Sequence, residues 1–463
     1  MNTVSVIALL IILGSIILSP TILLASVFIC SSFSAMTVLP GNVVPAMLAS
    51  IIFLFRIGIS QNFVPSFLAA LFQPRQLGFL GIFWLISLIG AMFLPRLFNG
   101  QIFTFSLNTA ELEPVRPQGT NYTQTAYLTM SVFMAASVCI LLQKKHEFLD
   151  ALLKAIFAGG YAIIATGLID IIANLLGKAD MLKIFYTANY GYSAGSILGT
   201  RRVLGLTPEP AAFGGLAMTM ASLLLFLRPV YAEKMRRFWV PLLGWSCMAM
   251  GFLSTSSTAY ASLFLMLGLY LFYNVDAVSE EGKILHKSIT KKMLNIVFLA
   301  VCFLLAVLLS GNFVDLINTL LIEKTGTSSY IERSSWTAAG LNAFIESYGL
   351  GVGIGSVRTS NFFANILAST GLPGALFFSL FLISLYLRHA PKRNSREEAV
   401  IKAIKFALLP MFAAKFLAGT TPDFGVLQGI LFGTIIALSQ SNDSLDLMKL
   451  QYQRMVIKRK RNL

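Results

Sequence analysis

Two adjacent arginines close a polar stretch and are soon followed by an acid, in the run T-R-R-V-L-G-L-T-P-E-P. The forked guanidinium groups of Arg201 and Arg202 are suited to hold a phosphate or pyrophosphate by paired hydrogen bonds. Pro210 fits the first turn of a helix, which places Glu209 at a helix start. The structural alternative is that the arginines reach towards lipid headgroups and that Glu209 only complements the helix dipole.

A second group of candidate residues lies in residues 330–358. The run Y-I-E-R-S-S-W contains Arg333 and Trp336, and apolar residues after it recur at helical spacing, which predicts an amphipathic helix near the membrane interface. The run G-L-G-V-G-I-G then permits a tight backbone path beside a ligand or another helix. It is not a phosphate loop, because no Lys-Ser/Thr pair follows it. Arg358 lies within reach of the same turn. The alternative is a packing helix followed by a flexible turn.

Asn361 opens the last candidate segment, N-F-F-A-N, which precedes T-G-L-P-G at residues 370–374. Its amide could contact a substrate, and the alternative is that it caps a helix. His146, His286 and His389 all fall in loops that the charge pattern below assigns to the other side of the membrane. No histidine, cysteine and acid cluster has metal-ligand spacing, so we expect no metal site and no cofactor.

The composition predicts that lipid surrounds most of these residues. Of the 463 residues, 56% are hydrophobic and 12% are charged, and the mean hydropathy is +0.76. A soluble domain carries about 25% charged residues. Only helices or a closed barrel satisfy the backbone in lipid, and the continuous apolar runs favour helices. We expect an all-α polytopic integral membrane protein, with residues 1–463 forming one membrane domain.

Stretches of about 20 apolar residues predict about 12–14 transmembrane helices. The expected spans are residues 3–18, 21–36, 43–58, 77–95, 125–143, 149–175, 209–228, 238–254, 258–275, 294–310, 366–388, 403–418 and 424–438. Residues 61–72 read as an interfacial segment. The net charge of +15 comes from residues that flank these spans, which argues against a nucleic-acid partner.

Lysines and arginines gather in alternate loops, which predicts the orientation of the chain. The basic set of loops contains Arg75, Lys144, Lys145, Arg228, Lys234, Arg236, Arg237, Lys283, Lys287, Lys291, Lys292, Arg388, Lys392, Arg393, Arg396, Lys402 and Lys405. We expect this set and the basic tail, residues 439–463, to be cytoplasmic. The long loops 176–208 and 311–365 and the shorter loop 96–124 are then external, and the odd number of spans places the N-terminus outside.

The external motifs resemble those of a known family. The pattern is R-x-x-G…E-P at the start of a span, followed by a late external loop with R-x-x-W…G-x-G-x-G-S…S-N…T-G-L-P-G, and it covers the chain from Arg201 to Gly374. It is similar to the Wzy-type O-antigen and exopolysaccharide polymerases, within the wider group that includes the O-antigen ligases. The resemblance implies a GT-C-type helical membrane fold in the bacterial cytoplasmic (inner) membrane.

The resemblance also implies a reaction and roles for residues. Repeat units on undecaprenyl pyrophosphate would be joined outside the membrane without a metal ion, and a partner protein would set chain length. Arg202 or its neighbour Arg201, together with Arg333, would neutralise the leaving pyrophosphate, with Arg358 as a third candidate. Glu209 would orient or deprotonate the acceptor hydroxyl. Trp336 and Asn361 are candidate substrate-binding residues.

Two other functions compete with the polymerase. Ligases of this group have an H-N…E-x-G pattern in the late loop, whereas this chain has Ser360-Asn361 and then Ser369-Thr370-Gly371, which favours a polymerase. A lipid-linked oligosaccharide flippase or another transporter would carry charges deep in several spans and show internal symmetry. Few charges lie inside predicted spans: Asp170 and Lys415 lie near the outer ends of theirs, and Arg56 and Lys154 lie near span ends. No repeat is evident.

Overall fold

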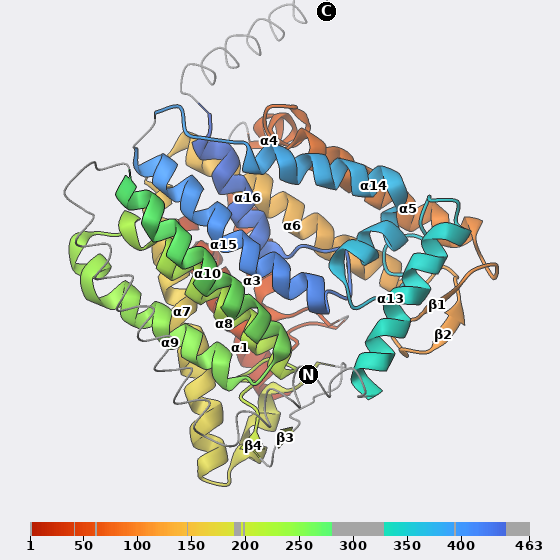
Figure 1. The fold of residues 1–463 in the computed structure, drawn as a ribbon, viewed down its shortest axis with the longest axis horizontal. Helices are drawn as coiled ribbons and strands as arrows, with labels where there is room; N and C mark the ends of the chain where they lie inside the picture. Colours follow the sequence, from red (N-terminus) through yellow and green to blue (C-terminus); the bar gives the residue numbers. More distant parts are fainter. Residues whose placement is uncertain are drawn as a thin grey trace, which may run out of the picture.

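The computed structural model describes residues 2–40, 42–60, 63–145, 147–188, 196–197, 200–279, 328–392 and 395–440, and these are mostly helical (Figure 1). The α-helices are α1 (Thr3–Gly14), α2 (Pro20–Cys30), α3 (Pro45–Gly58), α4 (Phe63–Phe72), α5 (Gly78–Leu97), α6 (Gly119–Lys144), α7 (Phe148–Leu175), α8 (Pro210–Phe226), α9 (Val240–Leu253), α10 (Ser257–Ser279), α13 (Ser328–Glu346), α14 (Phe362–Tyr386), α15 (Arg396–Ala418) and α16 (Val426–Leu438). The other elements are the short helices η1 (Ser15–Ile17), η2 (Ser31–Phe33), η3 (Ala179–Phe185), η4 (Arg228–Val230) and η5 (Met235–Trp239), the antiparallel pair β1 (Phe103–Phe105) and β2 (Leu112–Pro114), and the antiparallel pair β3 (Ser196–Ile197) and β4 (Thr200–Arg201). The expectation of an all-α class is confirmed for the described residues.

Several helices are long and apolar enough to cross a membrane. Among the described residues these are the four helices α5, α6, α7 and α14, and the bent pair α3 and α4 makes a fifth if it forms one span. Five shorter apolar segments of 10–17 residues accompany them. These helices are consistent with a multi-pass membrane protein. The count of about 12–14 spans stays a prediction, and the expected span 294–310 lies outside the described residues.

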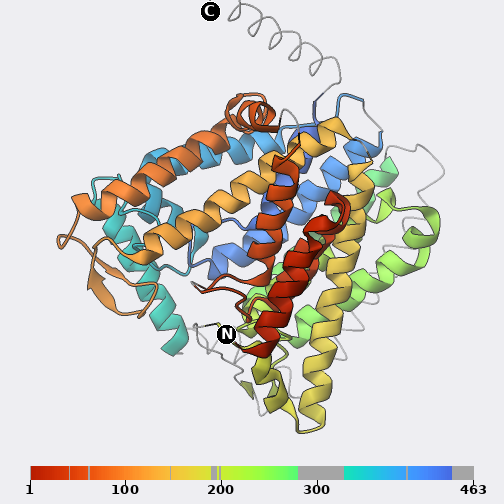
Figure 2. The same cartoon turned by 180° about the vertical axis from the view of Figure 1, so that it is seen from behind.

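Small residues let α16 lie directly against α6. A Cβ added to Gly429 would lie 2.2 Å from the carbonyl oxygen of Ser131, and one added to Gly433 would lie 2.1 Å from that of Ala135. The two glycines are four residues apart and so share one face of α16. Membrane helices often pack through such small residues, because their backbones can then approach closely. The helix pair α6 and α16 lies at the centre of the bundle in Figures 1 and 2.

The basic loops meet at one end of the bundle, which we call the basic end. Arg388, which follows α14, donates from Nη2 to the carbonyl oxygen of Arg75 at 2.8 Å. At the end of α6, Gln143 donates to the side chain of Gln440, which follows α16, at 3.0 Å. Loops that are more than 200 residues apart in sequence are therefore joined here by hydrogen bonds.

The other loops meet at the opposite end. Thr104 in β1 donates to the carbonyl oxygen of Ser356 at 2.8 Å, and Asn365 in α14 donates to that of Thr420 at 2.9 Å. In both views, α13 and the β1–β2 hairpin lie side by side at this end (Figures 1 and 2). The two sets of loops that differ in basic charge thus lie at opposite ends of the described bundle.

Candidate functional site

Asp170 fixes the loop that carries the first arginine motif. Its side chain is buried in α7, and Oδ2 accepts hydrogen bonds from the backbone N–H groups of Leu204 at 2.9 Å and Gly205 at 3.2 Å. Hydrogen bonds to a charged group are stronger than neutral ones. The acid at membrane depth therefore has a positioning role, since it holds the segment that leads from Arg202 to Glu209.

Glu209 lies at the N-cap position of α8 but does not cap it with its side chain. Its backbone is extended, Pro210 occupies the first turn as expected, and the Glu209 carbonyl oxygen accepts from the hydroxyl of Thr207 at 3.1 Å. The side chain therefore does not cap α8 by a hydrogen bond, and an electrostatic complement to the helix dipole remains the alternative. The carboxylate is left to interact with the arginines described next.

Arg202 is clamped by the turn before α10. Nε donates to Thr255 Oγ1 at 3.2 Å, and Nη2 donates to the Thr255 carbonyl oxygen at 3.1 Å. Thr255 has a φ of 45°, in the left-handed region that a β-branched residue rarely adopts. Such backbone strain concentrates at functional sites. Burial lowers the pKa of Arg202, the carboxylate of Glu209 raises it, and the positive charge of Arg333 lowers it.

Arg358 stacks on Trp336. Its guanidinium carbon lies 4.0 Å from the centre of the indole ring, and its backbone N–H donates to the carbonyl oxygen of Phe105 at 2.8 Å. The Nε atom of Arg358 and the Nε1 atom of Trp336 are both buried and have no hydrogen-bond partner among the described residues. Unpaired buried donors are rare and call for an explanation. We infer that Trp336 orients Arg358, because the stack accounts for the burial of both side chains.

The same charges act on Arg358 and on Arg202. Burial lowers the pKa of Arg358, Glu332 and Glu209 raise it, and Arg333 lowers it. Arg202 and Arg358, from separate parts of the chain, thus both interact electrostatically with the carboxylate of Glu209 and with the positive charge of Arg333. Like charges in partly buried surroundings repel one another unless an anion compensates them. We call Arg202, Arg333, Arg358 and Glu209 the arginine cluster. It can hold a polyanionic group and place a carboxylate beside it.

The sequence identified the residues of this cluster but not their arrangement. Arg201 lies in β4, and its side chain is outside the described residues. Asn361 is the N-cap of α14, and its side-chain oxygen accepts from the N–H of Ala364 at 3.1 Å. This is the capping alternative, so a contact of that oxygen with substrate would need the cap to open.

The glycine run holds Arg358 by close backbone packing. Gly349, Gly351, Gly353 and Gly355 all have positive φ, between 77° and 89°. A Cβ at Gly355 would lie 2.3 Å from the carbonyl oxygen of Thr120. The side-chain amide of Asn121 donates to the Ile354 carbonyl oxygen at 2.7 Å, and Thr120 donates to that of Gly355 at 2.8 Å. These hydrogen bonds join the run to α6, and the run leads directly to Arg358.

The sequence predicted α13 as an amphipathic helix but did not predict the partners of Lys415. Trp336 and Ala343 are buried, whereas Ile345 is 69% exposed, so the described residues leave this apolar side chain of α13 uncovered, as in an interfacial helix. Lys415 donates to the carbonyl oxygen of Asp423 at 3.3 Å, and the Asp423 carboxylate accepts from Ser131 at 2.7 Å. Lys415 therefore serves the junction of α15 and α16 and not the arginine cluster.

No group of three or more histidines, cysteines and acids that could bind a metal ion occurs in the described part of the chain. Comparison of the sequence with models of protein families and with curated proteins found no match.

Proposed function

We propose that the chain is a polysaccharide polymerase of the bacterial cytoplasmic membrane, with about 12–14 spans, a GT-C-type architecture and a cytoplasmic C-terminus. It joins oligosaccharide repeat units carried on undecaprenyl pyrophosphate at the outer surface of the membrane. The observation that carries the proposal is the arginine cluster at the end of the bundle opposite the basic loops. A partner protein that sets chain length would act with it.

The reaction needs an anion site and a base. An acceptor hydroxyl oxygen forms a bond to the anomeric carbon of the donor sugar, and the bond between that carbon and a pyrophosphate oxygen breaks. The electron pair leaves with the pyrophosphate, and the hydroxyl proton passes to the carboxylate of Glu209. Preorganised cations at the point where negative charge develops are usually the largest contribution to such catalysis.

The three arginines suit this leaving group. Arg202 has two of its nitrogens committed to the turn at Thr255, so its position does not depend on the ligand. Arg358 is held flat by Trp336 and by its backbone hydrogen bond to Phe105. Arg333 lies on α13, near both of them, since it affects the pKa of each. A pyrophosphate would relieve their mutual repulsion and could accept several forked hydrogen bonds.

The polymerase is favoured over the ligase at one position. Where the ligases have a histidine before the asparagine, this chain has Ser360, whose backbone N–H donates to Thr337 at 3.2 Å. A serine hydroxyl is a poor base, so the chain would have to use Glu209 for proton transfer. A transporter is disfavoured because Asp170 and Lys415 are bonded to loop backbone near the helix ends.

A complementation assay tests the proposal. The gene is deleted in its own host and restored as wild type, Arg202→Ala, Arg333→Ala, Arg358→Ala or Glu209→Gln, and the surface polysaccharide is run on a gel. Arg237→Ala is the matched control, because Arg237 is at the basic end and pairs with Glu233. Loss of one donor to a developing anion reduces the rate by about 10²–10³, so we expect the ladder to collapse to single repeat units.

Other outcomes identify the alternatives. A null strain that accumulates long lipid-linked polymer without transferring it would indicate a ligase. Lipid-linked single units that stay inside the cell would indicate a transporter. A full ladder from all four site variants at wild-type membrane level would show that the arginine cluster is not the site of polymerisation.

A further inference from the structure

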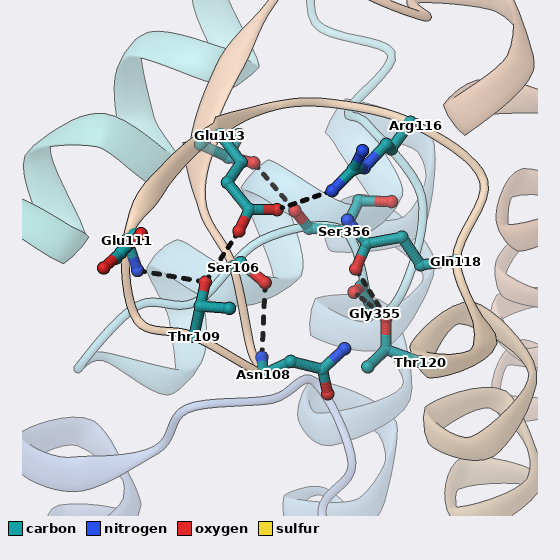
Figure 3. Close-up of polar contacts among 11 residues, drawn as sticks. Ser106, Asn108, Thr109, Glu111, Glu113, Arg116, Gln118, Thr120, Gly355 and Ser356 are labelled. Carbon is teal, nitrogen blue, oxygen red and sulfur yellow. Dashed lines mark hydrogen bonds and ion pairs between the residues drawn. The ribbon is translucent and has the colours of Figure 1, made fainter.

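A polar pocket of about 460 Å³ lies between the β1–β2 hairpin and the N-terminus of α6. Its side-chain lining includes Ser106, Asn108, Thr109, Glu113, Arg116 and Gln118 (Figure 3). The volume lies within the roughly 300–1,000 Å³ of small-molecule sites. Such sites are usually lined mainly by apolar groups, whereas these lining groups are hydroxyls, amides, a carboxylate and a guanidinium. The ligand must therefore be rich in hydrogen-bonding groups.

The charged groups of the pocket pair with each other. Glu113 accepts from the hydroxyl of Thr109 at 2.8 Å through one oxygen and from Arg116 at 3.3 Å through the other. In Figure 3 these three side chains converge, with Glu113 between the other two. The carboxylate oxygens keep free lone pairs, and the guanidinium keeps free N–H groups. Acceptors and donors thus stand side by side, which is the arrangement that vicinal hydroxyls of a sugar ring can match, because each hydroxyl both donates and accepts.

Asn108 adds a group that the fold itself does not use. Its backbone N–H donates to Ser106 Oγ at 3.3 Å, and its side chain is exposed. The side-chain amide makes no hydrogen bond to the described residues. An amide that offers two donors and an acceptor to the open pocket is available to a ligand.

The pocket adjoins the arginine cluster through the backbone. Ser106 directly follows Phe105, whose carbonyl oxygen accepts from the backbone N–H of Arg358. Thr104 donates to the carbonyl oxygen of Ser356 at 2.8 Å. The hairpin that lines the pocket is thus joined to the loop that carries Arg358. A glycan whose pyrophosphate occupied the arginine cluster would have this pocket beside it.

We propose that this pocket is a carbohydrate subsite that binds a pyranose ring through its vicinal hydroxyls. The inference rests on the proposed function for the identity of the glycan, which is either the acceptor repeat unit or the end of the growing chain. The inference is supported by the polar lining of the pocket and by its position next to the arginine cluster.

Binding by the purified full chain in lipid nanodiscs tests the inference. One probe is the host's repeat-unit oligosaccharide, released from its lipid by mild acid, and the other is inorganic pyrophosphate. We expect Asn108→Ala and Arg116→Ala each to weaken oligosaccharide binding by roughly tenfold, since each removes hydrogen bonds to the ligand. Pyrophosphate binding should change less than about twofold. Gln101→Ala is the matched control, because Gln101 is exposed on the same hairpin segment outside the pocket.

The outcomes separate this inference from the proposed function. Wild-type oligosaccharide affinity in an Asn108→Ala, Arg116→Ala double variant, or no oligosaccharide binding by the wild type, would overturn the subsite. Loss of pyrophosphate binding only in the arginine-cluster variants would still support the function. Asn108→Ala removes no side-chain hydrogen bond to the described residues, so we expect its melting temperature to equal that of the wild type, and weaker binding at an unchanged melting temperature is assigned to the lost contact. Tighter binding of a two-unit fragment than of one unit would identify the growing chain as the occupant, and equal binding would identify the acceptor unit.

Discussion

At the scale of single residues, the stack of Arg358 on Trp336 allows the orientation of the arginine to be changed while its charge is kept. Trp336→Phe keeps an aromatic face and removes an indole N–H that bonds to no group in the described part of the chain, so we expect nearly unchanged pyrophosphate affinity. Trp336→Leu removes the face. Cation–π contacts contribute about 0.5–2 kcal/mol, so affinity should fall between about twofold and thirtyfold. Titration with pyrophosphate measures the affinity of each variant. Equal loss in the two variants would contradict an orienting role for the ring.

Asp170 gives a prediction about loop position. Asp170→Ala removes the acceptor for the N–H groups of Leu204 and Gly205, which are buried. Loss of hydrogen bonds to a charged group costs about 1.5–3 kcal/mol each, so we expect a clearly lower melting temperature and loss of the polysaccharide ladder. Asp170→Asn keeps one acceptor oxygen and should be intermediate. Asp180→Asn is the control, since Asp180 forms an exposed ion pair with Lys183. Equal effects of Asp170→Ala and Asp180→Asn would contradict the assignment.

The charges of the arginine cluster predict how stability responds to anions. Burial lowers the pKa of Arg202 and of Arg358 from the ordinary value. A base with a lower pKa in the folded chain destabilises the fold while it is protonated, at every pH below its folded pKa. Since the ordinary pKa of arginine is above about 12, this cost persists through the neutral range and is relieved only at very alkaline pH.

Pyrophosphate should therefore raise the melting temperature by offsetting this cost. At 100 times its dissociation constant, a ligand stabilises by about 2.7 kcal/mol. We expect this effect to shrink in high salt, because exposed parts of the site are screened, and to vanish in Arg358→Gln. Differential scanning fluorimetry in detergent measures it. An equal shift from sulfate at the same ionic strength would mean that the cluster does not select pyrophosphate.

At the scale of elements, the glycine run predicts two separable effects. Gly355 has a φ of 84°, and a Cβ there would collide with Thr120 of α6. Gly100 has a similar φ of 76° but nothing within 4 Å of an added Cβ. Gly100→Ala should cost only the backbone strain, about 1–2 kcal/mol. Gly355→Ala should cost more and displace Arg358. Melting temperatures and membrane levels of the two variants give the comparison, and similar values would argue against close packing of the run.

The sequence predicted helices more reliably than it predicted how the loops fold. Apolar runs identified α5, α6, α7 and α14 within a few residues, because lipid-facing helices need continuous apolar sequence. The hairpin β1–β2 was not expected, since strands of three residues give no alternating pattern long enough to recognise. The buried hydrogen bonds of Asp170 were also missed in detail, because their acceptors and donors are 34 residues apart and only the fold brings them together.

For the candidate site, too, the sequence predicted the residues better than their arrangement. The family resemblance implied roles for Arg202, Arg333 and Glu209, and the forked guanidinium groups suited a phosphate. Their convergence with Arg358 could not be derived from spacing, since it depends on α13 packing beside β1. Asn361 shows the limit of residue type alone, because an asparagine before an apolar run suits a helix cap as well as a ligand.

At the scale of the whole molecule, the two ends of the bundle predict a sidedness that can be measured. Asn108 is exposed in the hairpin end, and Lys392 is exposed at the basic end. In a variant that lacks the four native cysteines, Asn108→Cys should react with a membrane-impermeant maleimide in cells whose outer barrier is opened. Lys392→Cys should react only after the cytoplasmic membrane is disrupted, because basic loops stay on the cytoplasmic side.

The labelling result decides which substrates can reach the arginine cluster. If Asn108→Cys reacts first, the cluster and the polar pocket face the compartment where no nucleotide-activated sugars are present, and the donor must arrive already attached to a membrane lipid. That requirement would link the basic loops at one end to the proposed role of the arginine cluster at the other. If Lys392→Cys reacts first, the cluster faces the cytoplasm, the polymerase proposal fails, and a soluble phosphorylated donor becomes the ligand to test against Arg202, Arg333 and Arg358.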